Sequence, residues 1–137
     1  MLRVTPDTNV LISAFITEGN EYAVLDLARE GKIKLIISEA ILEEFNEVIQ
    51  REKFGFSQEQ IVDFNTQLSA ISEIVEPREK ISAVKSDPDD DKILEAAVEG
   101  KVDYLISGDK HLLDLEKFRG INVVNARTFL NKIRSNS

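Results

Sequence analysis

Cysteine is absent from this chain of 137 residues, and histidine occurs once, as His111. The first absence excludes disulfide bonds, zinc sites built from thiolates and a cysteine nucleophile, and the second excludes a metal site built from several histidines. Any metal ion that binds here must therefore be held by oxygen ligands.

Long apolar runs and export signals are also lacking. No stretch approaches the roughly 18 apolar residues of a membrane span. The first residues, MLRVTPDTNV, have neither the charged start nor the cleavage site of a signal peptide. We therefore expect a cytoplasmic protein without a membrane partner.

The composition is that of a globular domain, with 42% hydrophobic and 31% charged residues. The length suits one hydrophobic core and no shift in composition marks a boundary, so we expect a single domain over residues 1–137. The net charge of −8 argues against a protein whose whole surface coats nucleic acid. A local groove for nucleic acid and a basic partner both stay open.

Short apolar segments alternate with segments of helical spacing along the chain. Strands are predicted at residues 2–5, 33–37, 73–77, 103–107 and 121–124. Helices are predicted at residues 9–16, 20–30, 38–54, 57–72, 87–97, 110–118 and 126–133. This alternation predicts an α/β fold in which right-handed crossovers join parallel strands and helices cover both faces of the sheet.

Acidic residues collect where predicted strands end or helices begin. Asp7 follows the first strand, Asp109 follows the strand 103–107, and the run 87–91 begins a helix. The carboxyl ends of parallel strands lie at one edge of the sheet, and ligands bind at that edge. We therefore expect these acids to meet there.

The helix 38–54 begins on the same edge and offers a further acid. Glu44 lies three residues after Ile41 and four before Val48, so it borders the apolar stripe of its helix. Other glutamates of this helix, such as Glu43, fall on the opposite face. Glu44 is therefore the candidate that points inward.

Helical spacing also sorts the acids of the run 87–91. Asp90 precedes Ile93 by three residues and belongs to the face that its helix buries, whereas Asp91 is rotated toward the edge of that face. Asp87 and Asp89 suit an N-cap and the positive end of the helix dipole instead. Asp90 is our choice for the site, with Asp91 as the alternative.

Carboxylates that converge must be neutralised. Two like charges ~4 Å apart repel by about 4 kcal/mol at an effective dielectric constant near 20. That energy is large against a total stability of about 5–15 kcal/mol. Either protons bind or a divalent cation sits between the acids, and an all-oxygen ligand set suits Mg²⁺ or Mn²⁺.

Four segments of the chain resemble the motifs of PIN domains, specifically of PIN-domain toxin-like proteins related to VapC-type toxins. DTNVLISA resembles the first motif, SEAILEEFNEVIQREKF the second, DPDDDKILEAA the third and DYLISGDKHLL the fourth. The likeness spans nearly the whole chain, and four motifs in this order are specific although each is weak alone. The site residues that it implies are Asp7, Asn9, Glu44, Asp90, Ser107 and Asp109.

The resemblance implies a three-layer α/β/α sandwich around a central, mostly parallel sheet of about five strands. It also implies an acidic pocket for Mg²⁺ or Mn²⁺ and metal-dependent endoribonuclease activity, frequently in a homodimer. RNA would be the substrate, and an antitoxin protein would be a partner if the chain is the toxin of a toxin–antitoxin pair. A PIN-fold scaffold that binds nucleic acid without cutting it is the alternative.

The resulting hypothesis is hydrolysis of RNA to a 5′-phosphate and a 3′-hydroxyl. Asp7, Asp90 and Asp109 would bind the metal that activates a water molecule. Glu44 would bind a second ion or orient that water, while Asn9 would steady the loop after the first strand.

Residues that contact the substrate are less well marked by the sequence. Ser107 either holds water or phosphate through its hydroxyl or caps a turn. Lys110, next to Asp109, is the first candidate for a phosphate contact, followed by Arg51 and Lys53. Each of these cations suits an ordinary solvated surface position better than a phosphate contact.

Overall fold

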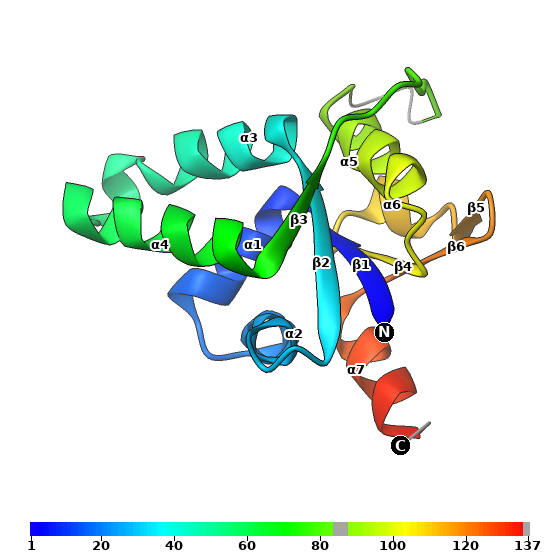
Figure 1. The fold of residues 1–137 in the computed structure, drawn as a ribbon, viewed down its shortest axis with the longest axis horizontal. Helices are drawn as coiled ribbons and strands as arrows, with labels where there is room; N and C mark the ends of the chain where they lie inside the picture. The colour runs from blue at the N-terminus through cyan, green and yellow to red at the C-terminus, as the bar shows by residue number, and fades with distance from the viewer. Residues whose placement is uncertain (84–87, 136–137) are drawn as a thin grey trace.

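The computed structural model describes residues 1–83 and 88–135 (Figure 1). Its sheet has six strands in the order β3-β2-β1-β4-β6-β5, and only the pairing of β5 with β6 is antiparallel. The strands are β1 Leu2–Pro6, β2 Ile33–Ser38, β3 Ser72–Val75, β4 Tyr104–Ile106, β5 Lys117–Phe118 and β6 Ile121–Val124.

Helices lie on both faces of this sheet, which confirms the predicted α/β/α layers. They are α1 Thr8–Ile16, α2 Asn20–Arg29, α3 Glu39–Ile49, α4 Gln58–Ile71, α5 Pro88–Glu99, α6 Lys110–Leu113 and α7 Ala126–Ser135, with a 3₁₀ turn η1 at Glu52–Phe54. The chain moves from β1 to β3 in one direction and then passes to β4 on the other side of β1. Right-handed crossovers therefore place α1 and α2 on the face opposite α5, and α7, which follows the last strand, packs beside α2.

The order of the strands creates a switch point between β1 and β4, where the chain reverses its direction across the sheet. Pro6 and Ile106, the last residues of these two strands, are paired. The residues that follow the two strands consequently lie side by side at the carboxyl edge.

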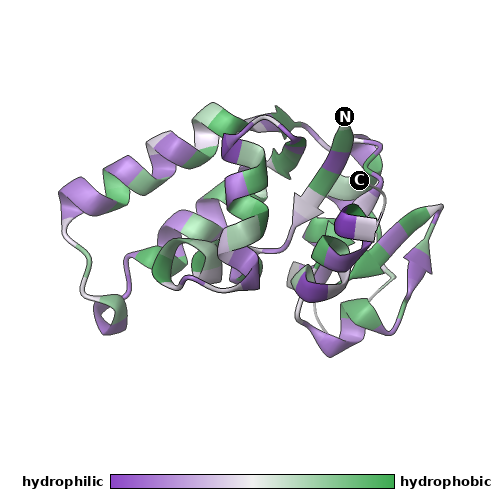
Figure 2. Cartoon of the chain, turned by 90° about the horizontal axis from the view of Figure 1, so that it is seen from below, coloured by the Kyte–Doolittle hydropathy of each residue, from purple (hydrophilic) through white to green (hydrophobic). Residues whose placement is uncertain are grey.

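Figure 1 shows α3 and α4 running side by side and extending away from the sheet. Phe15 of α1 joins them, because its ring centroid lies 5.4 Å from that of Phe45 in α3 and 5.1 Å from that of Phe64 in α4. Figure 2 shows hydrophobic and hydrophilic residues alternating along the helices, as expected for helices with one buried face.

Several predicted helix starts are confirmed at the level of single hydrogen bonds. The Ser38 hydroxyl accepts a hydrogen bond from the backbone N–H of Ile41 and caps α3. Ser57 caps α4 through a reciprocal capping box with Gln60. These short-range signals fix where both helices begin.

The predicted helix 110–118 is wrong beyond Leu113. Glu116 adopts a left-handed backbone with a φ of 57°, which ends the helical segment. The next residues form β5, and the turn at Arg119 and Gly120, with φ values of 48° and 84°, folds the chain back into β6. Two positive φ values in a two-residue loop are those of a tight hairpin. The sheet therefore has six strands instead of about five.

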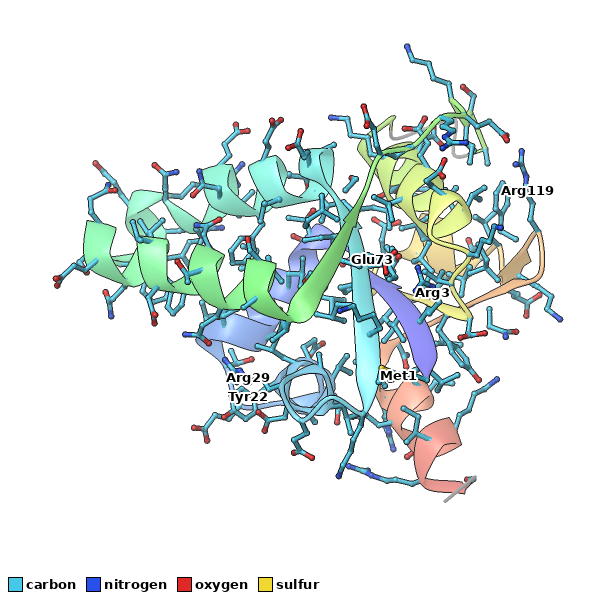
Figure 3. The ribbon with its side chains drawn as sticks, in the orientation of Figure 1. Met1, Arg3, Tyr22, Arg29, Glu73 and Arg119 are labelled. Carbon is cyan, nitrogen blue, oxygen red and sulfur yellow. The ribbon has the colours of Figure 1, made fainter. Side chains whose placement is uncertain are left out.

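An ion pair ties strands on either side of β2. The guanidinium of Arg3 in β1 contacts the carboxylate of Glu73 in β3 at 2.7 Å (Figure 3). Within the described parts of the chain, no helix combines the length and the apolar character that crossing a lipid bilayer requires.

Candidate functional site

Asp7 lies directly after β1 and is the N-cap of α1. Its Oδ1 accepts a 2.8 Å hydrogen bond from the backbone N–H of Val10. Its own N–H donates to the carbonyl of Ile106 at 2.9 Å, and only 5% of the residue is exposed. The carboxylate is therefore buried and held at the carboxyl end of the central strands.

Ser107 links Asp7 to Asp109. Its hydroxyl donates a 2.5 Å hydrogen bond to Oδ2 of Asp7 and accepts a 2.9 Å hydrogen bond from the backbone N–H of Asp109. Ser107 is fully buried, and its N–H donates to the carbonyl of Val124 in β6 at 3.0 Å. One hydroxyl thus connects the acids that follow β1 and β4.

Asp109 is half-buried and is the N-cap of the short helix α6. Its Oδ1 accepts hydrogen bonds from the backbone N–H groups of His111 at 2.8 Å and Leu112 at 3.3 Å. The cap fixes the carboxylate at the sheet edge and uses only one of its two oxygens.

The electrostatics of the site are dominated by the burial of Asp7. Burial raises the pKa of Asp7 above its ordinary value, and the hydrogen bonds from Ser107 and Val10 partly oppose that rise. The negative charges of Asp109 and Glu44 raise the pKa of Asp7 further. Asp109 and Glu44 are therefore near enough for their charges to act on Asp7.

Glu44 belongs to α3, which begins at the same edge directly after β2. It is half-buried, while its neighbours Ile41 and Phe45 are buried. This placement follows the predicted inward-facing edge of the apolar stripe. Its charge reaches Asp7 from a segment far away in the sequence.

Of the two candidate acids at the start of α5, Asp90 is buried, with 8% exposed, and Asp91 is half-buried. The predicted burial of Asp90 is thus confirmed. Oδ1 of Asp91 accepts a 3.1 Å hydrogen bond from the backbone N–H of Ala83. Asp87 and the side chain of Asp89 lie outside the described residues, so the capping roles predicted for them stay predictions.

The acids of α5 have a structural use that the sequence analysis did not assign. Besides Asp91, Glu95 accepts a hydrogen bond from the N–H of Ile81 at 2.9 Å, and Glu99 accepts one from the N–H of Arg78 at 3.0 Å. The three carboxylates are four residues apart and form a ladder along one face of α5. They hold the segment 78–83 against the helix.

A salt bridge also holds the same segment. The guanidinium of Arg119, at the tip of the β5–β6 hairpin, contacts the carboxylate of Glu79 at 2.6 Å. The four-residue spacing of the α5 acids was the signal in the sequence that such a ladder forms. Its partners are backbone groups, which leave no mark in the residue pattern.

The remaining predicted site residues lie at the surface. Asn9 is exposed on α1, and Lys110 is exposed beside Asp109. Arg51 and Lys53 are exposed beyond the end of α3, roughly 20 Å from its start at ~1.5 Å per residue. The Lys53 ammonium lies 5.0 Å from the ring centroid of Phe54. Of the predicted cations, Lys110 is thus the one beside a candidate acid.

Thr8, which follows Asp7, is a buried residue at this edge that was not predicted to belong to the site. Its side chain is 3% exposed, and its Oγ1 has no hydrogen-bond partner among the described residues. The signal available in the sequence was its helical spacing with Leu11, Ile12 and Phe15, which places it on an inner face of α1.

The donors at this edge fit a hard divalent cation by their chemistry, because all of them are carboxylates. A cation would also relieve the repulsion and the burial that raise the pKa of Asp7. Among residues 1–83 and 88–135, however, no three acidic or histidine side chains are arranged to hold one metal ion. Asp7 and Asp109 instead accept hydrogen bonds from the protein itself.

Comparisons with known proteins agree with this architecture. No curated protein sequence matches the chain. Among solved structures, the chain is similar to VapBC2 from Rickettsia felis, crystallised bound to a DNA fragment from their promoter, with a TM-score of 0.62 and 16% identity over 90% of this chain and 98% of that chain. At this identity the likeness is one of fold. The model of the PIN domain family matches residues 3–111, which include every acid of the candidate site, and the chain therefore belongs to the PIN domain family.

Proposed function

We propose that this PIN domain is a ribonuclease that depends on Mg²⁺ or Mn²⁺ and hydrolyses phosphodiester bonds of RNA. The observation that supports it most is the buried Asp7 carboxylate, which the Ser107 hydroxyl joins to the Asp109 loop. The charges of Asp109 and Glu44 act on the same carboxylate. A buried acid surrounded by other acids at a ligand-binding edge is typical of a cation site.

Asp7, Asp90 and Asp109 would hold the cation, which when bound supplies an activated water and counters the charge on the phosphate. Because no three described acids are arranged around one ion, binding requires some of these carboxylates to change rotamer. Asp109 has a second oxygen that its cap does not use. Glu44 would orient the attacking water from the α3 side.

The other residues of the chain position these acids. The Val10 N–H and the Ser107 hydroxyl hold the two oxygens of Asp7, so its carboxylate keeps a fixed orientation. Lys110 places a positive charge beside Asp109, where it would attract the phosphate being cut. The expected products are a 5′-phosphate and a 3′-hydroxyl.

The fold likeness to VapBC2 supports a proposal about the biological role. We propose that the chain is the toxin of a toxin–antitoxin pair in the cytoplasm, with RNA as its substrate, an antitoxin protein as its partner and a homodimer as its working form. A test is co-expression with the product of the adjacent gene, followed by co-purification and a growth assay.

Cleavage of end-labelled RNA by the purified protein tests the enzymatic proposal. Activity should require Mn²⁺ or Mg²⁺, disappear in EDTA and disappear in Asp7→Asn. Glu43→Gln is the matched control, because Glu43 is exposed on the same helix as Glu44. Cleavage that persists in Asp7→Asn would assign the activity to a contaminant.

One observation favours a second candidate, a PIN-fold protein that binds nucleic acid without cutting it. The described acids do not form a ready-made ligand group for one ion. Wild-type protein that binds RNA but leaves it intact with every divalent metal would support this candidate over the nuclease.

A further inference from the structure

An uncharged groove runs between α3 and α4, the two helices that extend side by side away from the sheet (Figure 1). Its volume is ≈ 760 Å³. Nine described residues line it and none of these nine is charged, although 31% of the chain is charged and its net charge is −8. The groove is therefore a gap in an otherwise strongly charged surface.

The α4 side of the groove has the residue spacing of a contact between helices. Four of its lining residues repeat at intervals of four, three and four positions, and we call them the α4 seam: Gln58, Val62, Asn65 and Ser69. Contact positions alternate in this way in coiled coils. The residues that pack α4 into its own domain form a different stripe, in which Leu68 is fully buried. α4 thus has a second packing face that the described residues leave open.

The middle of the α4 seam combines an exposed apolar side chain with a fixed amide. Val62 is 63% exposed, more than any other large hydrophobic residue described except the terminal Met1. Asn65 donates to Oδ1 of Asn46 in α3 at 3.0 Å and to the carbonyl of Ile61 at 2.9 Å. The two helices are therefore joined across the groove, and a partner that covers Val62 removes its apolar surface from water.

The charges of the chain favour a second copy of itself as that partner. Two copies that each carry −8 repel one another over most of their surfaces. An uncharged patch meets its own copy without opposing like charges. Amide and hydroxyl groups both donate and accept hydrogen bonds, so Gln58, Asn65 and Ser69 can bond to the same residue types across a two-fold axis. An acidic or basic partner would find no opposite charge in the groove.

We infer that the groove is the contact surface between two copies of the chain, with their α4 seams packed antiparallel; this inference rests on the homodimer of the proposed function. The orientation follows from the charged residues of α4, Glu59 and Asp63, which lie in its N-terminal half. A parallel pair would set these acids against themselves. In the antiparallel pair they lie beside the uncharged C-terminal half of the other α4, and the long Gln58 meets the short Ser69.

Single cysteines test this surface directly, because the chain has none of its own. Val62→Cys, in the middle of the α4 seam, should give a cross-linked dimer with a short bismaleimide. In Ser69→Cys the two cysteines would lie about 16 Å apart along the helices at ~1.5 Å per residue, because each faces Gln58 of the other copy. Ser69→Cys should therefore cross-link poorly. Ile16→Cys and Ile74→Cys, at exposed apolar positions on α1 and β3, are the controls and should stay monomeric on the gel.

Sedimentation equilibrium gives the second readout. Wild type should sediment with twice the mass of one chain. Val62→Glu sets two like charges near the two-fold axis and should raise the Kd of the dimer at least about 100-fold, whereas Ile74→Glu adds the same charge elsewhere and should leave it unchanged. Val62 is exposed, so urea unfolding of Val62→Glu should match that of wild type.

Two results overturn the inference and differ in what they leave standing. A dimer that persists in Val62→Glu and cross-links through Ile16→Cys or Ile74→Cys would keep the homodimer and place it on another surface. Wild type that is monomeric at every concentration would remove the homodimer as well, and loss of antitoxin binding in Val62→Glu would then assign the groove to that partner. Strong cross-linking of Ser69→Cys would overturn the antiparallel packing. RNA cleavage by the same samples tests the nuclease separately.

Discussion

The Ser107 hydroxyl donates a 2.5 Å hydrogen bond to Oδ2 of Asp7, a residue 100 positions away in the chain. The same hydroxyl accepts from the backbone N–H of Asp109. The residues after β1 and β4 are thereby joined through a single oxygen. The parallel pairing of Pro6 with Ile106 is what makes this contact possible.

Ser107→Ala tests this link. Without the hydroxyl, Oδ2 of Asp7 loses a donor that lowers the pKa of Asp7, so its ionisation becomes harder. We expect the variant to lose about 1–3 kcal/mol of stability, the usual cost of an unsatisfied buried group. We also expect Mn²⁺ binding, measured by calorimetry across a pH series, to require a higher pH. Ser107→Thr keeps the hydroxyl and serves as the control; equal behaviour of the alanine and threonine variants would refute a role for the hydrogen bond.

Asp7→Asn tests the burial of charge through the pH dependence of stability. The pKa of Asp7 is raised in the folded protein, so the native state takes up this proton more readily than the unfolded state. Its contribution to the free energy of unfolding is therefore largest below the unfolded pKa and declines as pH rises toward the folded pKa.

The measurement is urea unfolding in EDTA from acidic to neutral pH. Asn keeps the N-cap of α1 without the charge. The difference in stability between Asp7→Asn and wild type should grow in favour of the variant as the pH rises. A difference that is independent of pH would show that Asp7 ionises as easily in the folded chain as in the unfolded one.

Glu95→Ala tests the ladder on α5. The variant leaves the N–H of Ile81 without its carboxylate partner and should lose about 1 kcal/mol of stability. Glu95→Gln retains an acceptor oxygen and should be close to wild type. Chemical denaturation measures both, and Mn²⁺ affinity should be the same in the two variants because this acid contacts the segment 78–83 and is not part of the site.

Gly100→Ala tests the packing of α5 on the sheet. A Cβ at this position would lie 2.3 Å from Cγ2 of Ile36 in β2, which is closer than side chains tolerate. Overpacking of this kind costs about 1–3 kcal/mol. Gly108→Ala, where a Cβ meets nothing within 4 Å, should change stability by less than about 0.5 kcal/mol. Thermal unfolding of the two variants makes the comparison.

Asp90→Asn and Asp91→Asn decide which acid of α5 serves the site. Asp90 is buried and Asp91 holds the N–H of Ala83. RNA cleavage should fall at least about 100-fold in the first variant and stay within about threefold of wild type in the second. If Asp91→Asn lost activity and Asp90→Asn kept it, Asp91 would be the third metal ligand in place of Asp90.

Local signals in the sequence predicted much of the fold. The predicted helices 38–54 and 57–72 begin at Ser38 and Ser57, and the structure shows both serines as caps, a signal that acts over three positions. The burial of Asp90 followed from its spacing to Ile93, because one helix has one buried face. The parallel strands and the helices on both faces were predicted from the alternation of strand and helix patterns joined by right-handed crossovers.

What the sequence did not predict depends on single backbone conformations or on distant partners. The left-handed backbone at Glu116 ended α6 early, and neither this residue nor Arg119 is of a type that favours positive φ. The unpartnered hydroxyl of Thr8 depends on what the rest of the fold leaves near it. Residue patterns carry no information on such contacts.

The central claim is that acids from four separate segments form one cation site, and calorimetric titration with Mn²⁺ tests it most directly. The account predicts that wild type binds Mn²⁺ and that Glu43→Gln, altered at an exposed acid, binds it equally well. It predicts affinities at least about tenfold weaker in each of Asp7→Asn, Glu44→Gln, Asp90→Asn and Asp109→Asn. Wild type that does not bind the ion, or four variants that bind it as wild type does, would contradict the account.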